Sequence, residues 1–138
     1  MRDSQSSLRD SQSAIPERFL TMNRIELERR TKQFAIRIIE FAATLPKSRS
    51  GSVVEYQLVK AGTSVGANYR EAGRAESRND FIHKIGIVEK EASESRYWLE
   101  ICAETKLGNE QKRSWLLREA NELLAIFTSS GRTAKARR

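Results

Sequence analysis

The acidic residues between positions 89 and 104 are the first candidates for chemistry, because carboxylates inside a helical bundle can hold metal ions. This segment carries five glutamates: Glu89, Glu91, Glu94, Glu100 and Glu104. A carboxylate metal centre of the bundle type takes inward glutamates from two helices and a Glu-x-x-His pair from each of two others. The sequence contains no Glu-x-x-His, and the glutamates alternate with Lys90, Arg96 and Lys106. We therefore interpret them as a solvated or salt-bridged surface and expect no metal.

The single histidine and the single cysteine restrict other side-chain chemistry. No serine–histidine–aspartate triad can be argued from one histidine among helices. His83 and Cys102 would supply two ligands, whereas a structural zinc site takes four. A lone cysteine also has no partner for an intrachain disulfide. We interpret both residues as packing or surface positions, expect no cofactor, and predict that the protein is not an enzyme.

The glycines at positions 62, 66 and 73 raise the question of a phosphate-binding loop. Such a loop needs a lysine and a hydroxyl residue directly after its second glycine. Here Ala67 and Asn68 follow Gly66, and G-x-G-x-x-G is also missing. A nucleotide-binding loop follows a strand, whereas the pattern here is helical. We therefore reject the phosphate-loop interpretation.

Close helix packing is a better explanation of the same glycines. Each glycine costs roughly 1 kcal/mol relative to alanine inside a helix, so the spacing needs a reason. Gly62, Gly66 and Gly73 fall on one face of a helix, flanked by the apolar positions Val54, Leu58, Val65 and Tyr69. We predict a stripe without side chains where another helix approaches closely. Asn68 borders this face and could form a hydrogen bond at the crossing.

Four helical segments position these residues. Pro46 and Gly51 bracket one break, and Gly108 with Asn109 marks another, as a terminating glycine followed by a capping residue should. Ser77, with Asp80 three residues later, resembles a capping box. We expect helices over residues 23–45, 52–76, 78–107 and 110–128, with no competing strand pattern. The predicted fold class is all-α, an up-down-up-down antiparallel four-helix bundle.

The predicted domain organisation has one folded unit between two extensions. The bundle is expected over residues 23–130. Residues 1–22 contain the near-duplicate RDSQSSL and RDSQSAI, and we expect a disordered Ser-rich extension, although the spacing of Leu8 and Ile15 leaves room for a fragile helix. Residues 131–138 are expected to form a basic flexible tail.

Two predicted helices carry apolar residues on both sides. The core face of the first helix contains Leu27, Phe34, Ile38, Phe41, Ala42 and Leu45. Its far side has Ile25, Ile36, Ile39 and Ala43, and the far side of the third helix has Ile87, Tyr97, Trp98 and Ile101. Identical chains supply identical patches, so we predict a closed homo-oligomer. The alternative is that the N-terminal extension shields these side chains.

Net charge and hydropathy indicate which partners and which cellular location to expect. The net charge is +7 and the isoelectric point is about 9.9. Much of the excess comes from residues 131–138 and from the loop PKSRSG at 46–51. A flexible basic tail attracts any polyanion, although a purely solubilising end is an equal alternative. No apolar run approaches the roughly 18 residues of a membrane span, and no secretory h-region is seen near residue 1, so we expect a cytoplasmic protein without a membrane role.

The segments SVGANYREA at 64–72 and NDFIHKIGIVEKEASESRYWLEI at 79–101 carry a family resemblance. They resemble the small bacterial four-helix-bundle family that includes proteins encoded in intervening sequences of large-subunit ribosomal RNA and accessory variability proteins of diversity-generating retroelements. The resemblance covers about residues 24–128. The matching positions are Ser64, Gly66, Asn68, Glu71, Asp80, Phe81, Glu94, Tyr97, Trp98 and Leu99. Ala72 stands where the family often has glycine.

The resemblance implies a helical bundle that assembles as a ring, commonly a pentamer, without enzymatic activity. Its retroelement members act beside a reverse transcriptase and contact nucleic acid through a basic surface. Our leading hypothesis is an oligomeric accessory protein that binds RNA or DNA. The predicted phosphate contacts are Arg29, Arg30, Lys47, Arg49, Arg132, Lys135, Arg137 and Arg138. The alternative is a protein-docking scaffold that recruits a partner enzyme and has no nucleic-acid role.

Overall fold

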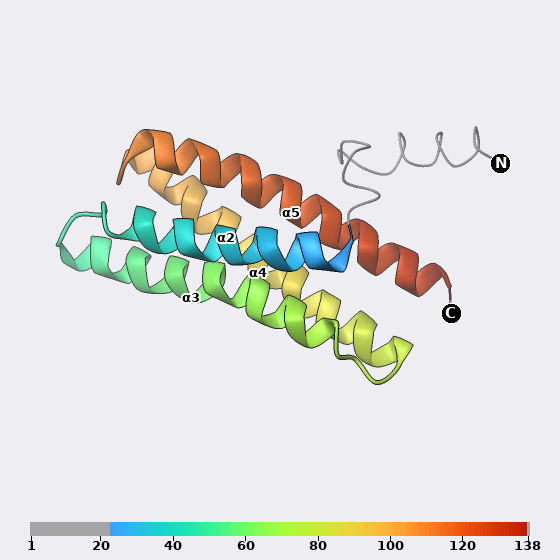
Figure 1. Ribbon diagram of the computed structural model, residues 1–138. Helices are drawn as coiled ribbons and strands as arrows, with labels where there is room; N and C mark the ends of the chain where they lie inside the picture. The colour runs from blue at the N-terminus through green and yellow to red at the C-terminus, as the bar shows by residue number, and fades with distance from the viewer. Residues whose placement is uncertain (1–22, 138) are drawn as a thin grey trace, which may run out of the picture.

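The computed structural model describes residues 23–137 and is entirely helical over that range (Figure 1). The four helices are α2 (Arg24–Ala42), α3 (Arg49–Ala72), α4 (Arg78–Thr105) and α5 (Glu110–Ala136). This confirms the predicted all-α class with four helices and without strands in the described part of the chain. The extension predicted for residues 1–22 lies outside the described residues, as does Arg138.

Each helix starts at a polar residue whose side chain accepts a hydrogen bond from a backbone N–H of the first turn. These N-caps are Asn23, Ser48, Ser77 and Asn109. Asp80 completes the expected arrangement at α4, but its carboxylate accepts from the N–H of Glu76, one residue before the cap. The caps satisfy N–H groups that have no partner within the helix, and they fix where each helix begins.

Helix α3 begins three residues earlier than predicted because Ser48 caps it. Gly51 therefore lies in the first helical turn rather than in a loop. A Cβ at this position would collide with the carbonyl oxygen of Pro46, so only glycine fits. At the other break, Gly108 has a φ of 77°, a left-handed conformation that glycine adopts without strain. Arg49 is consequently part of α3, and Lys47 precedes its cap.

The prediction of a flexible tail from residue 131 is wrong for residues 131–136. Helix α5 continues to Ala136 instead of ending at Thr128. The reason is packing: Gly131 is buried in α5, and a Cβ there would lie 3.6 Å from the side chain of Ile85 in α4. The guanidinium of Arg78 at the start of α4 also donates to the carbonyl oxygen of Arg137. The basic residues at this end are therefore attached to a helix.

The glycine stripe of α3 faces α2, as predicted. A Cβ at Gly62 would lie 2.7 Å from the side chain of Ile38, and one at Gly66 would lie 3.1 Å from Thr31. A Cβ at Gly73 would lie 3.1 Å from the side chain of Arg24. As the α3 number rises the α2 number falls, so these two helices run in opposite directions. Asn68 does not bridge the crossing, because its amide donates to the carbonyl oxygen of Ser64 in its own helix.

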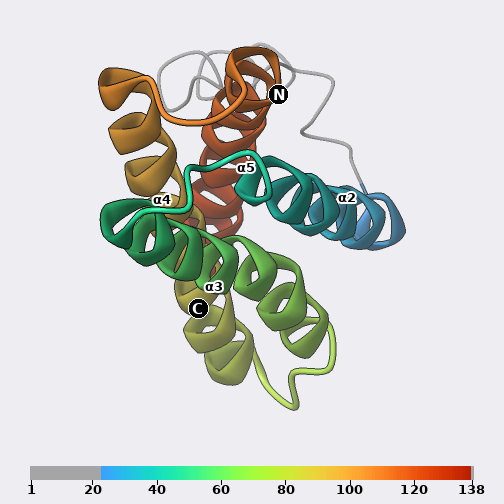
Figure 2. The same ribbon diagram turned by 90° about the vertical axis from the view of Figure 1, so that its left-hand side faces the viewer.

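The apolar core lies between the helices and includes the predicted core face of α2. Its largest completely buried side chains include Phe34, Phe41, Phe127, Ile38, Leu58, Ile85, Leu99, Leu116 and Leu123. Helix α4 lies between α3 and α5 and packs on both, whereas α2 packs on α3 and makes a smaller contact with α5. Figure 2, which looks towards the helix ends, shows α2 at the side of the bundle. The position of α2 therefore depends mainly on α3.

Gly62→Ala and Gly86→Ala form a matched pair that tests the close contact between α2 and α3. Gly86 is exposed on α4, and a Cβ there would meet nothing within 4 Å. Both substitutions gain the same helix propensity, about 1 kcal/mol. Only Gly62→Ala forces the buried side chain of Ile38 to move. We expect Gly62→Ala to be less stable than Gly86→Ala by about 1–3 kcal/mol in urea unfolding followed by circular dichroism. Equal stabilities would contradict the close contact.

Candidate nucleic-acid interface

The predicted phosphate contacts do not form one patch on a single chain. Lys47 and Arg49 lie at the start of α3, while Lys135 and Arg137 lie at the end of α5, beside the start of α4. These positions are at opposite ends of the bundle, separated by about the length of α3, which is 24 residues or about 36 Å. Arg29 is exposed on α2. Arg132 is exposed on α5, and it also makes an electrostatic or hydrogen-bonding contact.

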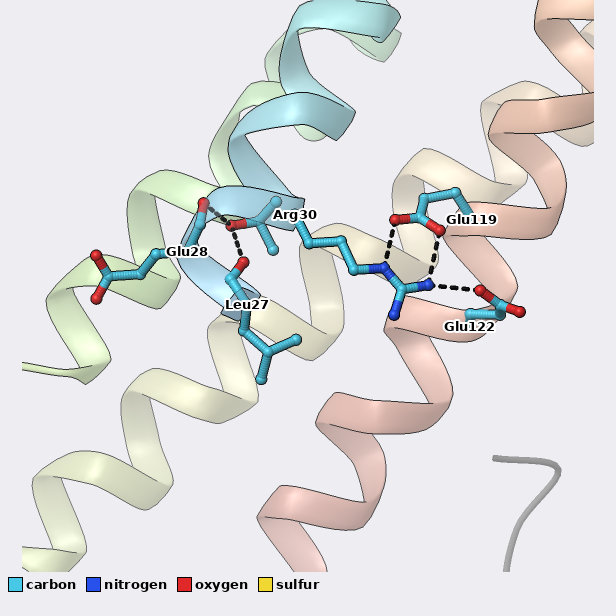
Figure 3. A network of polar contacts seen from close by, with 6 residues as sticks. Leu27, Glu28, Arg30, Glu119 and Glu122 are labelled. Atoms are coloured by element: carbon cyan, nitrogen blue, oxygen red, sulfur yellow. Dashed lines mark hydrogen bonds and ion pairs between the residues drawn. The ribbon is translucent and has the colours of Figure 1, made fainter. Parts of the chain in front are cut away.

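Arg30 serves a structural purpose. Its guanidinium lies between Glu119 and Glu122 of α5 (Figure 3). Nε donates to one Glu119 oxygen at 2.7 Å, and Nη2 donates to the other at 2.8 Å and to Glu122. Burial disfavours the charge, but the hydrogen bonds and charges of Glu119 and Glu122 outweigh it and raise the pKa of Arg30. The side chain is 14% exposed. This geometry argues against Arg30 as a phosphate contact.

An open hollow of about 780 Å³ lies where the chain enters α3. Its lining residues are Lys47, Ser48, Arg49, Ser52, Val53, Tyr56 and Gln57. The charged members of this set, Lys47 and Arg49, are both basic. Val53 and Tyr56 are 52% and 63% exposed, which is unusual for large apolar side chains. The hollow therefore combines positive charge with accessible apolar surface.

A second, smaller hollow of about 220 Å³ lies further along α3, in the groove between α3 and α2. Gly66, Ala35, Ala67, Thr31 and Thr63 line it. Lys32 and Arg70 flank it, with Glu28 as the one acidic lining residue. This groove exists because small side chains bring the two helices together.

One side of α3 connects the two hollows. Arg49, Tyr56, Ala67 and Arg70 follow helical spacing, so they lie along the same side of the helix, which also carries the exposed acidic residue Glu71 near its end. Lys60 lies between the hollows, with its ammonium 5.9 Å from the centroid of the Tyr56 ring. The distance from Arg49 to Arg70 is about 30 Å along the helix. We call the residues Lys47, Arg49, Tyr56, Lys60 and Arg70, together with Lys32 of α2, the α3 basic face.

The residues of the family motif mostly build the fold. Gly66 meets α2, and Asp80 in the first turn of α4 accepts from the N–H of Glu76. Leu99 is completely buried, and the Ser64 hydroxyl donates to the carbonyl oxygen of Lys60. The remaining motif positions range from partly buried to exposed: Phe81, Glu94 and Trp98 are partly buried, and Glu71 and Tyr97 are exposed. The Trp98 indole N–H is buried and has no hydrogen-bond partner within residues 23–137. These positions do not converge on a single pocket.

The glutamates of α4 range from partly buried (Glu89, Glu91, Glu94) to exposed (Glu100, Glu104), and the thiol is buried. Within the described residues, no three His, Cys, Asp or Glu side chains lie close enough to hold a metal ion. Glu89 accepts a hydrogen bond from the hydroxyl of Thr128, and burial, followed by the charge of Glu94, raises the pKa of Glu91. Cys102 is completely buried, and burial raises the pKa of its thiol.

Comparison with known proteins identifies the family. Residues 23–129 match the model of the 23S rRNA-intervening sequence proteins. The chain belongs to that family. A solved structure from Bacteroides thetaiotaomicron VPI-5482, described as a protein of unknown function from the S23 ribosomal protein family, is 32% identical. It aligns with a TM-score of 0.72 over 80% of this chain and 99% of its own. No match is found among curated proteins.

Family membership confirms the resemblance to intervening-sequence proteins. The matched residues, 23–129, agree with the range of about 24–128 expected from the sequence, and they coincide with α2, α3, α4 and most of α5.

In the part of the chain that the structure describes, no helix has both the length and the apolar character needed to cross a membrane.

The sequence interpretation missed four members of the α3 basic face: Lys32, Tyr56, Lys60 and Arg70. It assigned Arg49 to a loop, and so it did not extend the helical spacing from Arg49 to Tyr56 and onward. With the N-cap placed at Ser48, this spacing would have indicated a common side of α3. The contribution of Lys32 depends on the packing of α2 against α3 and follows from the structure alone.

Arg30→Gln and Arg29→Gln test the structural assignment of Arg30. Removing Arg30 leaves the Glu119 carboxylate, which is 9% exposed, without this cation. We expect Arg30→Gln to lower the free energy of unfolding by about 1–3 kcal/mol. Arg29 is exposed on the same helix turn, so Arg29→Gln should stay within about 0.5 kcal/mol of the wild type. Urea unfolding measures both, and an unchanged stability of Arg30→Gln would contradict the assignment.

Proposed function

We propose that this protein is a non-catalytic, oligomeric accessory protein that binds RNA or DNA through the α3 basic face. The observation that carries the proposal is the hollow at the start of α3, where Lys47 and Arg49 accompany exposed apolar side chains. Lys60 and Arg70 extend the positive charge along the same helix. Phosphate backbones bind such surfaces by releasing counterions, which requires no unique base sequence.

The family name and the net charge of the chain both support a nucleic-acid partner. Its members are named for intervening sequences of 23S rRNA, and the net charge of +7 favours a polyanionic partner. The absence of a catalytic role is argued from the lone histidine and the buried Cys102. We further propose a cytoplasmic setting and, by the retroelement resemblance, a reverse transcriptase as a possible protein partner.

Assembly into a closed ring is the second part of the proposal. Ile25, Ile36 and Ile39 on the outer side of α2 are 74%, 41% and 53% exposed, a pattern that identical copies can cover. On α4, Tyr97 is 53% exposed, and the predicted outer residues Ile87, Trp98 and Ile101 are half-buried. By family resemblance we propose a pentamer. A ring would present several α3 basic faces and α5 ends to one nucleic acid and would increase its avidity.

A protein-docking scaffold is the alternative function. The exposed isoleucines of α2 would then meet a partner enzyme instead of another copy. A pull-down from nuclease-treated lysate separates the two, because a directly bound protein survives nuclease treatment and one tethered through nucleic acid does not.

The double variant Lys47→Gln/Arg49→Gln tests the interface. With a labelled structured RNA, the slope of log K against log salt should become shallower by about 0.7–0.9 for each lost phosphate contact. The charge-matched control is Lys90→Gln/Arg118→Gln, which removes an exposed lysine and arginine from α4 and α5 and should retain the wild-type slope. Equal losses in both variants, or an RNA that never binds in a salt-dependent manner, would contradict the proposed interface.

Sedimentation velocity at micromolar concentration, applied to the wild type and to Ile36→Ser/Ile39→Ser, tests assembly. We expect one closed oligomer for the wild type and smaller species for the variant, because each substitution removes apolar surface that the contact would bury. The helical circular dichroism signal should be retained, since both side chains are exposed in the single chain. A wild-type monomer at micromolar concentration would refute assembly, and an unchanged variant oligomer would exclude this side of α2.

A further inference from the structure

We propose that the hollow at the start of α3 binds unpaired nucleotides, with Tyr56 as the surface on which a base stacks and with Lys47 and Arg49 as the phosphate contacts. This inference rests on the proposed function and narrows its substrate from nucleic acid in general to single-stranded segments. It assigns a binding residue, Tyr56, that is neither charged nor part of the family motif.

The first argument is the exposure of an aromatic side chain inside a basic hollow. Tyr56 is 63% exposed, whereas Tyr69 on the same helix is 8% exposed and packs against Phe127. The Tyr56 ring therefore adds nothing comparable to the core, although it lines a hollow of about 780 Å³. A base can stack on such a ring irrespective of its identity, because every base has a π-face.

The second argument is the arrangement of charge around that ring. Lys47 and Arg49 line the same hollow, and the Lys60 ammonium lies 5.9 Å from the ring centroid. Cations on both sides of an aromatic residue match a nucleotide chain, in which phosphates flank every base. Lys60 also forms a cation–π contact that helps to hold the ring. The acidic residue Glu55 is adjacent in sequence but does not line the hollow.

The third argument concerns the form of the nucleic acid. In a duplex the faces of the bases are stacked on one another, so an exposed tyrosine reaches base edges, sugars and phosphates but has no free base face on which to stack. Unpaired bases, in contrast, can turn outward and stack on aromatic side chains. Tyr56 therefore contributes binding free energy to a single strand, whereas Lys47 and Arg49 contribute to both forms.

Another copy of the chain is the competing occupant of the hollow. In the closed ring proposed above the contact is head-to-tail, so the hollow of one chain would meet a different surface of its neighbour. The exposed isoleucines of α2 offer three large apolar side chains for self-assembly, with Arg29 and Lys32 among them, whereas the hollow offers Val53 and Tyr56. The number of subunits formed by Tyr56 variants distinguishes the two occupants.

The experiment uses the full chain and fluorescence anisotropy with four probes. These are a short single-stranded RNA, a DNA of the same sequence, the RNA duplex, and an abasic strand that keeps the phosphates. The variants are Tyr56→Ala and Tyr56→Phe, with Gln111→Ala as control because Gln111 is also exposed and uncharged but lies on α5. We expect Tyr56→Ala to weaken single-strand binding about tenfold and to leave the abasic strand and duplex unchanged. Tyr56→Phe and Gln111→Ala should bind as the wild type does.

The salt dependence separates this inference from the proposed function. Tyr56→Ala removes no charge, so its slope of log K against log salt should equal that of the wild type. Full affinity of Tyr56→Ala, an equal loss on the abasic strand, or an equal loss in Tyr56→Phe would overturn stacking while leaving the proposed function intact. A change in subunit number in Tyr56→Ala would assign the hollow to self-assembly. If no probe binds in a salt-dependent manner, both proposals fail.

Discussion

The close contact between α2 and α3 is the constraint on which the remaining structure depends. Gly62 and Gly66 leave room for Ile38 and Thr31, which are completely buried against the glycine stripe. Helix α2 has a larger contact with α3 than with α5. The glycine stripe of α3 therefore decides where α2 lies. The same contact creates the groove lined by Gly66 and Ala67 and brings Lys32 of α2 beside Arg70 of α3. These glycines match no phosphate-binding motif, and they act indirectly, by shaping the surface beside them.

Charge on this protein is divided between structural and accessible groups. Arg30 of α2 donates hydrogen bonds to Glu119 and Glu122 of α5 and so stabilises the smaller of the two contacts that α2 makes (Figure 3). Lys47 and Arg49 line an open hollow and are exposed to solvent. A net charge of +7 does not distinguish these two situations. Only the geometry shows which cations remain accessible to a phosphate. It favours phosphate contacts on the outer side of α3 over contacts at the ends of the chain.

Particular residues show how far sequence reasoning reaches. The core face of α2, the caps at Ser77 and Asn109 and the glycine stripe were predictable, because each depends on spacing within one helix. The end of α5 was not: Ser129, Ser130 and Gly131 resemble a helix end, and only contact with Ile85 and Arg78 of α4 explains why the helix continues. The partners of Arg30 could not be foreseen for the same reason, since they lie 89 and 92 positions away. Features that depend on a second helix require the structure.

Ultraviolet cross-linking of the wild-type protein to a single-stranded RNA, followed by peptide mass spectrometry, tests the central claim most directly. The account predicts cross-linked peptides from residues 47–70, centred on Tyr56, with cross-links declining as salt releases the RNA from the α3 basic face. Cross-links confined to α4 or to the end of α5, with none along α3, would contradict it.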